Sequence, residues 1–599
     1  MILTIRTSLS LACKRSSARL SDPPTLALLR TRVNSFHYSR TYSAQSRADT
    51  QSGGAAHVRK FAMVTFLSLG VASYYAWQNS LLRTSPTNGI PVVRKVASNS
   101  DSDPDAALNA FPVPSVTLAA TYGTPEDVQK AIEELRLAFP DKHRVSTDPN
   151  VLKVHGSSEN SYHPTSSHSV VVQAKSTEDV VKIVNISRKY RIPIIPYSGA
   201  TSLEGHFSGH PSGSICLDLS AMDQILEINE ADGDLRCQAG ARWEDINNTL
   251  KEKGIPLFFP LDPGPGATIG GMVGTGCSGT NAVRYGTAKA EWFLNLTVVL
   301  PSGKVIKTRR RARKSAAGFD TTKLFIGAEG TLGVVTEATL RLTPRIPTKV
   351  AMAQFPNVGM AVSAASEILK TPHGSHIQCV ELLDDNMMSA INIAGLIEHP
   401  YPVQDTLFFK FQGSPESVTE TSKAVRDIVK RHGSSRFEFA STDNEAEEIW
   451  QNRKYALMST FAAHPGMKCW TTDVCVPISK LPQLVYETKE DLAKTGLKST
   501  IVGHVGDGNF HALILFKDEK ELQSVGAAVG RLVHRAIAMD GTCTGEHGVG
   551  VGKTQYLVEE LGDGTVELMK TVKRAVDSLN LFNPGKLYPP ATKEPGHTA

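Results

Sequence analysis

The side chains best suited to chemistry lie in the glycine-rich stretch IVGHVGDGNFHALI, residues Ile501 to Ile514. It contains two imidazoles, those of His504 and His511. If residues 506–509 form the turn of a β-hairpin, His504 pairs with His511, and their Cβ atoms lie about 5 Å apart on one face of the sheet. That spacing suits two imidazoles that bind one metal ion. Either histidine alone is better explained as a structural side chain, so the prediction depends on the pair.

A third metal ligand is offered by a second glycine-rich stretch, GTCTGEHGVG, which contains Glu546 next to His547. Two histidines and a glutamate with an open coordination position are typical of a catalytic divalent metal site. Zinc is favoured by affinity, with manganese and iron as alternatives. A structural zinc site would favour cysteines, and only Cys543 is close in the sequence. The prediction depends on the hairpin register, because a shift of one residue turns one imidazole to the opposite face.

Two further glycine-rich stretches predict a site for a dinucleotide. PYSGATSLEGHF, from Pro196, follows a predicted strand, and DPGPGATIGGMVGTGCSGTNAVRYG, from Asp262, combines glycines with small residues. Such loops let backbone N–H groups approach phosphate oxygens, although either loop alone is also explained by turns. Gly271, Gly274 and Gly276 give GxxGxG instead of the GxGxxG of Rossmann folds. The stretch HGVGVGKT is not a P-loop, because it begins with histidine where that motif needs glycine.

The elements that must position these residues follow two patterns along the chain. A helix is predicted over 124–139, with Thr124 as N-cap and Pro125 at its first position. Residues 169–197 read strand, helix, strand, and hairpin-like strands continue to about Pro344. After Pro344, longer predicted helices are mixed with strands. We therefore expect a domain boundary near Pro344 to Thr348.

Composition fits a globular chain of two or three domains. The chain has 599 residues, of which 41% are hydrophobic and 21% charged, and its net charge of +5 requires no nucleic-acid partner. Its eight cysteines are scattered without a CxxC pair, which is typical of reduced, buried thiols.

The N-terminal part predicts a targeting segment. Residues 1–60 are rich in arginine and serine with only Asp22 and Asp49 as acids, which is typical of a mitochondrial presequence, although a disordered basic tail is the alternative. The apolar run 61–77 is just long enough for a transmembrane helix, and it fits an inner-membrane anchor or a cleaved sorting signal equally well. Residues 78–115 read as a linker.

Six motifs taken together resemble those of one enzyme family. In chain order they are PYSGATSLEG, GGMVGTGCSGTNAVRYG, KSAAGFDTTKLFIGAEGTLGVVTEATL, GHVGDGNFH, GTCTGEHGVG and NPGKLYP. This set is similar to that of the flavin-dependent D-2-hydroxyacid dehydrogenases of the vanillyl-alcohol-oxidase-like FAD superfamily, over about Val116 to Pro589. The resemblance implies an α+β fold. A two-part PCMH-type FAD-binding domain (116–344) would be followed by an α+β cap domain with the metal site (345–575) and a segment returning to the flavin (576–599).

The resemblance implies FAD bound by the first domain. It places the 196–203 and 270–281 loops around the pyrophosphate, the 329–334 segment beside the adenosine, and the 583–586 segment near the flavin. His206 is the nearby candidate for a histidyl-flavin link, but its SLEGHF setting favours non-covalent FAD. The implied cofactor-binding residues are Pro196, Ser198, Gly199, Ala200, Thr201, Ser202, Leu203, Pro263, Gly270, Gly271, Gly274, Gly276, Asn281, Glu329, Gly330, Gly333, Val334, Asn583 and Lys586.

By the same resemblance, His504, His511 and Glu546 are metal ligands and His547 is the catalytic base. Arg453 and Lys468 match positions that bind the substrate carboxylate. Arginine is favoured because it can bind a carboxylate through two nitrogens, although ordinary surface charge explains both residues as well. In this chemistry the metal lowers the pKa of the substrate hydroxyl, a neutral imidazole takes the proton, and the C2 hydrogen leaves as hydride to the flavin.

The resemblance to mitochondrial members of the family implies D-lactate as substrate and cytochrome c as electron acceptor. The protein would lie at the inner membrane facing the intermembrane space, or be soluble there after cleavage. Leu513 lies where a D-2-hydroxyglutarate dehydrogenase has asparagine, which favours a small substrate. D-2-hydroxyglutarate, glycolate or another D-2-hydroxyacid with another acceptor is the alternative. Two other classes stay open, a flavin-dependent ether-lipid synthase and a membrane-anchored scaffold with structural zinc.

Overall fold

The computed structural model describes residues 120–590, apart from 159, 165 and 396–399. The predicted presequence, the apolar run 61–77 and the linker therefore lie outside the described residues. No helix in the described part of the chain is both long enough and apolar enough to cross a membrane.

The first sheet has four strands in the order β1-β2-β4-β3. The predicted strand–helix–strand unit is confirmed as β2 (Val170–Gln173), α4 (Thr177–Tyr190) and β3 (Ile194–Tyr197). β4 (Ile215–Asp218) lies between β2 and β3 and is parallel to both, while β1 (Val145–Ser146) is antiparallel to β2. The loop that follows β3 therefore begins at the carboxyl edge of parallel strands, where ligands of open α/β sheets bind.

Helix α2 (Pro125–Ala138) packs with α4 on this first sheet. The predicted N-cap is confirmed, because the Thr124 hydroxyl accepts a hydrogen bond from the Asp127 N–H and the Asp127 carboxylate accepts from the Thr124 N–H. This capping box satisfies backbone donors that the first helical turn leaves free. A short helix, α3 (Pro149–His155), connects β1 to β2.

The second sheet has five antiparallel strands in the order β5-β6-β10-β8-β9. Helices α5 and α6 contribute to the hydrophobic core that packs against it. The bounds in this part of the chain are β5 (Ile225–Asn229), β6 (Asp234–Gln238), α5 (Trp243–Glu252), β7 (Leu257–Phe258), α6 (Ile269–Thr275), α7 (Ala282–Tyr285), β8 (Phe293–Val299), β9 (Val305–Lys307), β10 (Val334–Arg341) and β11 (Thr343–Pro344).

The largest sheet is antiparallel, in the order β15-β12-β14-β13-β18-β19-β16, with β17 paired to β19. Its strands are β12 (Thr348–Phe355), β13 (Ile377–Leu383), β14 (Asp405–Gln412), β15 (Arg436–Phe439), β16 (Lys468–Thr471), β17 (Val474–Cys475), β18 (Ser499–Gly503) and β19 (Asn509–Phe516).

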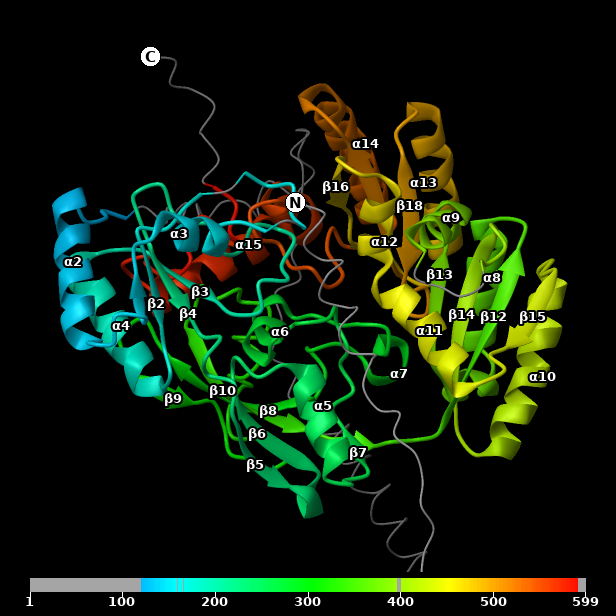
Figure 1. Cartoon of the computed structure of the whole chain (residues 1–599), viewed down its shortest axis with the longest axis horizontal. Coiled ribbons are helices and arrows are strands. Elements are labelled where there is room, and N and C mark those ends of the chain that lie inside the picture. Colours follow the sequence, from blue (N-terminus) through cyan, green and yellow to red (C-terminus); the bar gives the residue numbers. More distant parts are fainter. Residues whose placement is uncertain (1–119, 159, 165, 396–399, 591–599) are drawn as a thin grey trace, which may run out of the picture. The chain divides into compact units, whose positions relative to one another are not determined.

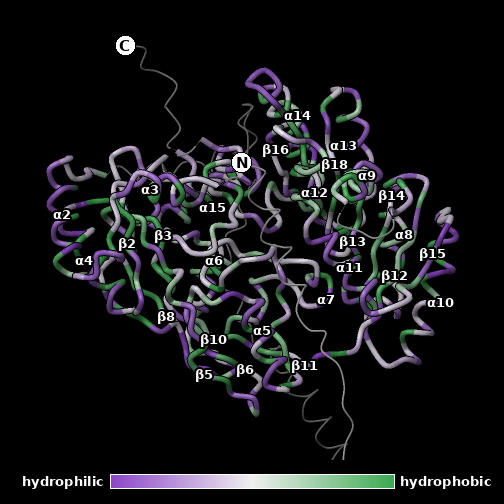
Figure 2. The backbone as a smooth tube through the Cα atoms, in the orientation of Figure 1, coloured by the Kyte–Doolittle hydropathy of each residue, from purple (hydrophilic) through white to green (hydrophobic). Residues whose placement is uncertain are grey.

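Helices cover both faces of the largest sheet (Figure 1). One face is covered by α8 (Val358–Leu369), α10 (Pro415–Arg431), α13 (Leu481–Thr495) and α14 (Glu519–Ala538), and the other by α9 (Asp385–Ala394), α11 (Asp443–Lys454) and α12 (Ala456–Ala463). Because both faces are covered, β13 and β19 are buried along their whole length, and hydrophobic colour is frequent in this sheet in the tube of Figure 2. Polar side chains within these strands therefore need specific partners.

The end of the chain returns to the first two sheets. Helix α15 (Leu557–Val576) contacts the largest sheet's core through Val566, and its last turns pack on the core of the five-stranded sheet. Beyond it, Phe582 bridges to Ile194 at the edge of β3. The architecture is thus mixed helix and sheet in two regions, as expected. We propose the domain boundary between β11, which pairs with β7, and β12 at Thr348.

Candidate active site

A cavity of about 540 Å³ lies among the two predicted glycine-rich loops of the first region and the 329–334 segment. It lies along the carboxyl end of β3, the start of α6 and the turn before β10. Most residues predicted to bind the cofactor line it, namely Pro196, Ser198, Gly199, Ala200, Thr201, Ser202, Leu203, Pro263, Gly270, Gly271, Gly274, Glu329, Gly330, Gly333, Val334 and Asn583.

Three predicted cofactor residues do not line this cavity, and each has another role in the structure. Gly276 ends α6 in the left-handed conformation, with φ at 71°. The Asn281 side chain is buried, donating to the Pro260 carbonyl at 2.9 Å and accepting from Gln378 at 2.9 Å. The Lys586 ammonium donates to the Ser208 carbonyl at 2.7 Å, which holds the C-terminal segment to the first region.

The cavity wall fits a polar ligand. Among the described residues, the buried atoms Ser198 Oγ, Thr268 Oγ1 and Asn583 Oδ1 have no hydrogen-bond partner, and all three residues line the cavity. Buried polar atoms without partners are rare in folded proteins, so these atoms are suited to a ligand that completes their bonds. A dinucleotide with phosphate, ribose and ring nitrogens offers such partners.

The hairpin that carries the two histidines differs from the prediction in its register. Val502, and not His504, lies opposite His511, and residues 504–508 form the loop between β18 and β19. The predicted pairing of His504 with His511 is therefore wrong by two positions. His504 directly follows β18, in the loop, and strand alternation does not set the direction of its side chain. The two imidazole rings still meet, with centroids 5.5 Å apart.

His504, His511 and Glu546 converge on one point, as predicted. Glu546 Oε1 lies 3.0 Å from His504 Nε2 and 3.3 Å from His511 Nε2. The other ring nitrogens are engaged elsewhere, because His504 Nδ1 bonds to a Glu381 oxygen at 2.9 Å and His511 Nδ1 to the Thr472 carbonyl at 3.0 Å. Such partners fix the tautomer of metal-binding histidines and leave Nε2 as the ligand atom. The donor set therefore fits a divalent cation.

In this cluster, carboxylates and imidazoles lie close together and shift each other's pKa. Burial disfavours a charged His504, but the carboxylates of Glu381 and Glu546 outweigh this and raise its pKa well above the usual value. Burial likewise disfavours an ionised Glu546, yet His504 and His511 hold its pKa well below the usual value. The site thus favours a carboxylate beside positive charge, which is the charge that a bound cation would supply.

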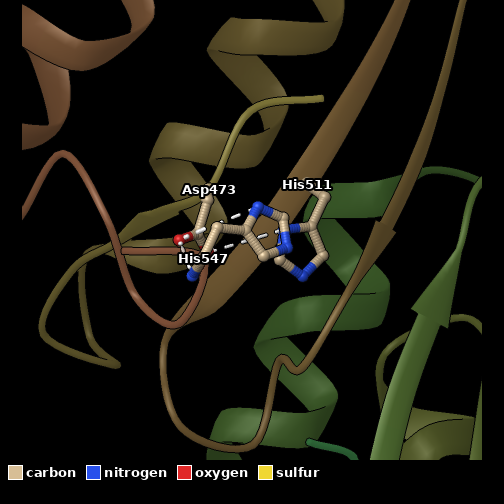
Figure 3. Close-up of side chains that lie close together, drawn as sticks. All are labelled: Asp473, His511 and His547. Atoms are coloured by element: carbon tan, nitrogen blue, oxygen red, sulfur yellow. Dashed lines mark hydrogen bonds and ion pairs between the residues drawn. The ribbon is translucent and has the colours of Figure 1, made fainter. Parts of the chain in front are cut away.

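A second group of possible ligands, Asp473, His511 and His547, shares His511 with the first (Figure 3). The rings of His511 and His547 are stacked, with centroids 4.7 Å apart. Asp473 already accepts hydrogen bonds from the backbone N–H groups of Glu546 and His547 at 2.9 and 2.8 Å. Together with the Thr544 hydroxyl, these donors occupy Asp473 Oδ2, which leaves this oxygen less able to bind a cation.

His547 lies beside the cluster and is suited to accept a proton. Burial lowers its pKa to about 4 against the opposing effect of Asp473, so the imidazole is neutral at pH 7. Its Nε2 lies 4.0 Å from Glu546 Oε1, and its Nδ1 lies 3.9 Å from Asp473 Oδ2. A second cavity of about 160 Å³ contacts His504, His511, Glu546 and His547. Glu546 and His547 line both cavities.

The structure brings one of the two predicted cations to this second cavity. Arg453 lines it from the end of α11, with Nε 2.7 Å from a Glu381 oxygen. Lys468 is exposed and lines neither cavity. Thr471, three positions later on β16 and therefore on the opposite face of the sheet, lines the second cavity. Lys454, which was not predicted, lines both cavities.

Sequence reasoning missed three polar residues that hold the predicted ones. Ser278 donates to Glu546 Oε2 at 2.6 Å. Asp473 accepts from the backbone N–H groups of Glu546 and His547, and Glu381 bonds to His504 Nδ1. Glu381 is the one charged residue in the apolar strand IQCVELL, and Asp473 follows a strand in TTDVCVP. A lone acid in a buried strand is rare unless it is paired, so the sequence of this strand indicates that Glu381 has a specific partner.

Comparisons with known proteins show which family models and relatives the chain matches. Residues 168–309 match the model of the FAD binding domain, and residues 347–587 match that of the FAD linked oxidases, C-terminal domain. The chain is 44% identical to the mitochondrial D-lactate dehydrogenase (cytochrome) of Arabidopsis thaliana, over 79% of this chain and 83% of that protein. It is 41% identical to mitochondrial D-lactate dehydrogenase (cytochrome) 1 of Saccharomyces cerevisiae, over 79% and 82%.

A solved structure has the same fold. The 4-ethylphenol oxidase of Gulosibacter chungangensis superposes with a TM-score of 0.65, over 78% of this chain and 99% of that chain, at 17% identity. At this identity the likeness concerns the fold alone.

Proposed function

The chain belongs to the FAD-linked oxidase family, and on that premise we propose that it is a mitochondrial enzyme that oxidises D-lactate to pyruvate and passes the electrons through FAD to cytochrome c. The observation that carries the proposal is the wall shared by the two cavities, to which Glu546 and His547 belong. A small hydroxyacid in the second cavity would contact the neutral imidazole of His547 next to the FAD cavity.

The large cavity is the proposed site of FAD. The loops at 198–203 and 270–274 line it and would bind the phosphates through their backbone N–H groups. The turn that carries Glu329 and the segment that carries Asn583 also belong to the cavity wall. When bound, FAD supplies the acceptor for the two electrons of the oxidation.

We propose that this FAD is bound without a covalent link. His206 is the histidine that lies closest to the predicted flavin loops in the sequence. Its Nδ1 bonds to the Ser202 hydroxyl, whereas its Nε2, 3.1 Å from a Glu329 oxygen, makes no hydrogen bond with any described residue, and the side chain lines the large cavity. The proposal of non-covalent FAD is supported by the SLEGHF setting of this histidine.

His504, His511 and Glu546 are the proposed ligands of a divalent metal, with zinc favoured and manganese or iron as alternatives. Such an ion, when bound, supplies a Lewis acid that lowers the pKa of a substrate hydroxyl. Ser278 and Glu381 orient two of these ligands through the hydrogen bonds described above.

His547 and Arg453 are the proposed residues for proton transfer and substrate binding. His547 is neutral at pH 7 and lines the second cavity, so it would take the proton of the substrate hydroxyl. Arg453, on the wall of the same cavity, would bind the substrate carboxylate and thereby orient C2. Thr471, Val502 and Leu513 also line this cavity and leave room for a short side chain.

We assign the chain to the mitochondrion, the location named for its relatives. The proposal includes residues 1–60 as a presequence and residues 61–77 as an inner-membrane anchor or a cleaved sorting signal. In either form the enzyme would face the intermembrane space, where cytochrome c accepts electrons.

The test is anaerobic reduction of the purified protein by a panel of D-2-hydroxyacids, with metal analysis of the same sample. We expect D-lactate to bleach the flavin absorbance fastest, with about one divalent ion per chain. Faster bleaching by D-2-hydroxyglutarate would contradict the substrate, and an active protein without metal would contradict the proposed ligands. Yellow colour that stays with acid-precipitated protein would contradict non-covalent FAD.

A further inference from the structure

Three buried carboxylates hold the loop of residues 544–553, which carries Glu546 and His547. They belong to Asp473, Glu329 and Glu204, whose exposed fractions are 1%, 6% and 1%. The three residues come from distant parts of the chain. Each accepts hydrogen bonds from the loop or forms an ion pair with it, and none of them is among the proposed metal ligands.

Asp473 fixes the part of the loop that carries the reactive side chains. Its Oδ2 accepts hydrogen bonds from the N–H groups of Glu546 and His547 and from the Thr544 hydroxyl, at 2.9, 2.8 and 2.8 Å. Its Oδ1 accepts from the Asn509 amide at 3.0 Å, two positions before His511 on β19. One carboxylate therefore sets the loop relative to the strand that carries a second proposed ligand.

Glu329 and Glu204 fix the remainder of the loop. Glu329 accepts from the N–H groups of Val549 and Gly550 at 2.6 and 2.9 Å. Glu204 forms an ion pair with Lys553 at 3.0 Å, and Lys553 lies 3.5 Å from Asp473. The ammonium of Lys553 thus lies between two of the carboxylates and offsets part of their buried negative charge.

The loop needs such partners because its sequence gives it little preference for one conformation. TGEHGVGVGK has a glycine at every second or third position, and glycine loses more backbone freedom on ordering than any other residue. Hydrogen bonds from N–H groups to buried carboxylates are strong because the local dielectric is low.

We propose that Asp473, Glu329 and Glu204 form a carboxylate clamp that positions Glu546 and His547, with Asp473 as the positioning residue for both. This inference rests on the proposed function, which makes Glu546 a metal ligand and His547 the base. Its consequence is that metal affinity depends on a residue that does not touch the metal. Two clamp residues lie in the first region, so the loop is held from the FAD side as well.

The first test is Asp473→Asn in the full chain. The amide carries no charge and has one acceptor oxygen where the carboxylate has two, so part of the loop loses its partners. We expect the affinity of the metal-depleted protein for Co²⁺, followed by its visible absorption, to fall about 10- to 100-fold, as for other residues that orient metal ligands. The FAD content should stay as in the wild type, and kcat should fall more than KM rises.

The matched control is Asp405→Asn. Asp405 is also buried, accepts a backbone N–H from Asp385 at 2.9 Å and binds Lys489 at 2.8 Å, but it lines neither cavity. We expect this variant to lose stability while its Co²⁺ affinity and kcat stay within about twofold of the wild type.

A second variant disturbs the clamp without changing a charged residue. A Cβ at Gly545 would lie 2.4 Å from Asn509 Nδ2 and 3.2 Å from Asp473 Oδ1, so Gly545→Ala pushes the loop away from the clamp. We expect the same loss of Co²⁺ affinity with FAD retained. Gly530→Ala on α14, where a Cβ meets nothing within 4 Å, is the control and should behave as the wild type.

Wild-type Co²⁺ affinity and kcat in both Asp473→Asn and Gly545→Ala would overturn the clamp. Equal loss of FAD and metal in Asp473→Asn would also overturn it, since Asp473 would then serve folding in general. Failure of the wild type to reduce its flavin with D-lactate would contradict the proposed function instead.

Discussion

The neutral imidazole of His547 is the residue on which the proposed chemistry depends most directly. Replacing it in His547→Ala removes the proton acceptor but none of the three proposed metal ligands. We expect the rate of flavin reduction by D-lactate to fall about 10²- to 10⁴-fold, with FAD and metal retained. Stopped-flow spectroscopy and metal analysis of the same preparation check this.

The control for that variant is His534→Ala. His534 is exposed and pairs with Glu559 at 2.7 Å, away from both cavities. It should reduce its flavin at the wild-type rate. If His547→Ala also does so, another group accepts the proton.

Residue type and local pattern grouped His504, His511 and Glu546, which the structure brings together, and the family motifs added the proposed role of His547. Neither predicted the residues that hold them. His504, His511, Glu546 and His547 stand in glycine-rich stretches that mark them in the sequence. Asp473 and Glu381 are 36 and 123 positions away from the Asn509 and His504 side chains that they contact. At such sequence separations no local motif links the two partners, so these contacts could not be predicted from the sequence. The exposure of Lys468 could not be predicted either. It depends on how β16 pairs within the sheet, and the sequence alone does not show that pairing.

At the scale of the element, the turn between β18 and β19 depends on Gly508. Its φ is +94°, and a Cβ there would lie 2.1 Å from the Val476 carbonyl oxygen. We expect Gly508→Ala to lower the free energy of unfolding by about 1–3 kcal/mol and to weaken metal binding, because both histidines flank this turn. Denaturant unfolding and Co²⁺ titration measure the two effects.

Gly496→Ala is the control for Gly508→Ala, because it introduces backbone strain without a steric clash. Gly496 ends α13 with φ at +68°, and a Cβ there meets nothing within 4 Å. The free energy of unfolding of this variant should fall by about 1 kcal/mol, and its metal affinity should stay unchanged. Equal metal affinity in both variants would show that the turn does not set the histidine geometry.

The hairpin as an element was predictable, but its register was not. The alternation of apolar residues and the glycine-rich turn indicate that two strands meet, while several loop lengths fit the same letters. The two imidazoles meet despite this error, because His504 directly follows β18 and its ring centroid lies 5.5 Å from that of His511.

His168 gives the protein a stability that depends on pH. It is buried, with Nε2 bonded to the His155 and Phe207 carbonyls and Nδ1 to the Ser214 hydroxyl, and burial lowers its pKa to about 4. The unfolded chain, with a pKa near 6.5, takes up the proton first, so stability falls as the pH drops from about 6.5 toward 4. The loss should reach about 2 kcal/mol by pH 5.

The measurement compares wild type with His168→Gln in denaturant unfolding at pH 7 and pH 5. Glutamine keeps a donor and an acceptor but does not titrate. The variant should therefore lose less stability between the two pH values. An equal loss in both proteins would assign the acid sensitivity to other groups.

At the scale of the whole molecule, the end of the chain belongs to the FAD-binding region. Phe582 bridges to β3, Asn583 lines the large cavity, and Lys573 donates to the Thr331 and Phe582 carbonyls at 2.8 Å. We expect a chain that ends at residue 576 to purify without FAD. A chain that ends at residue 590 should keep it, as measured by flavin absorbance per protein. Full FAD content in the shorter chain would contradict the role of this segment.

The two regions could be predicted from the change of pattern near Pro344, because short hairpin strands and long helices have different periods. The return of the chain end could not be predicted from periodicity. It depends on single contacts, such as the Asn583 amide bonded to the Glu329 carbonyl at 2.8 Å, that join opposite parts of the chain. Only the family motif NPGKLYP pointed to it.

The contacts that complete the catalytic loop also bear on how the molecule acquires its structure. Ser278 and Glu546 are 268 positions apart, and Glu329 and Val549 are 220 apart. Because the loop of residues 544–553 lies near the end of the 599-residue chain, its contacts with Ser278, Glu329 and Asp473 can form only after most of the chain has been synthesised. A shorter chain contains His504 and His511 without Glu546 and His547 beside them. The proposed site is therefore assembled only when synthesis is nearly complete.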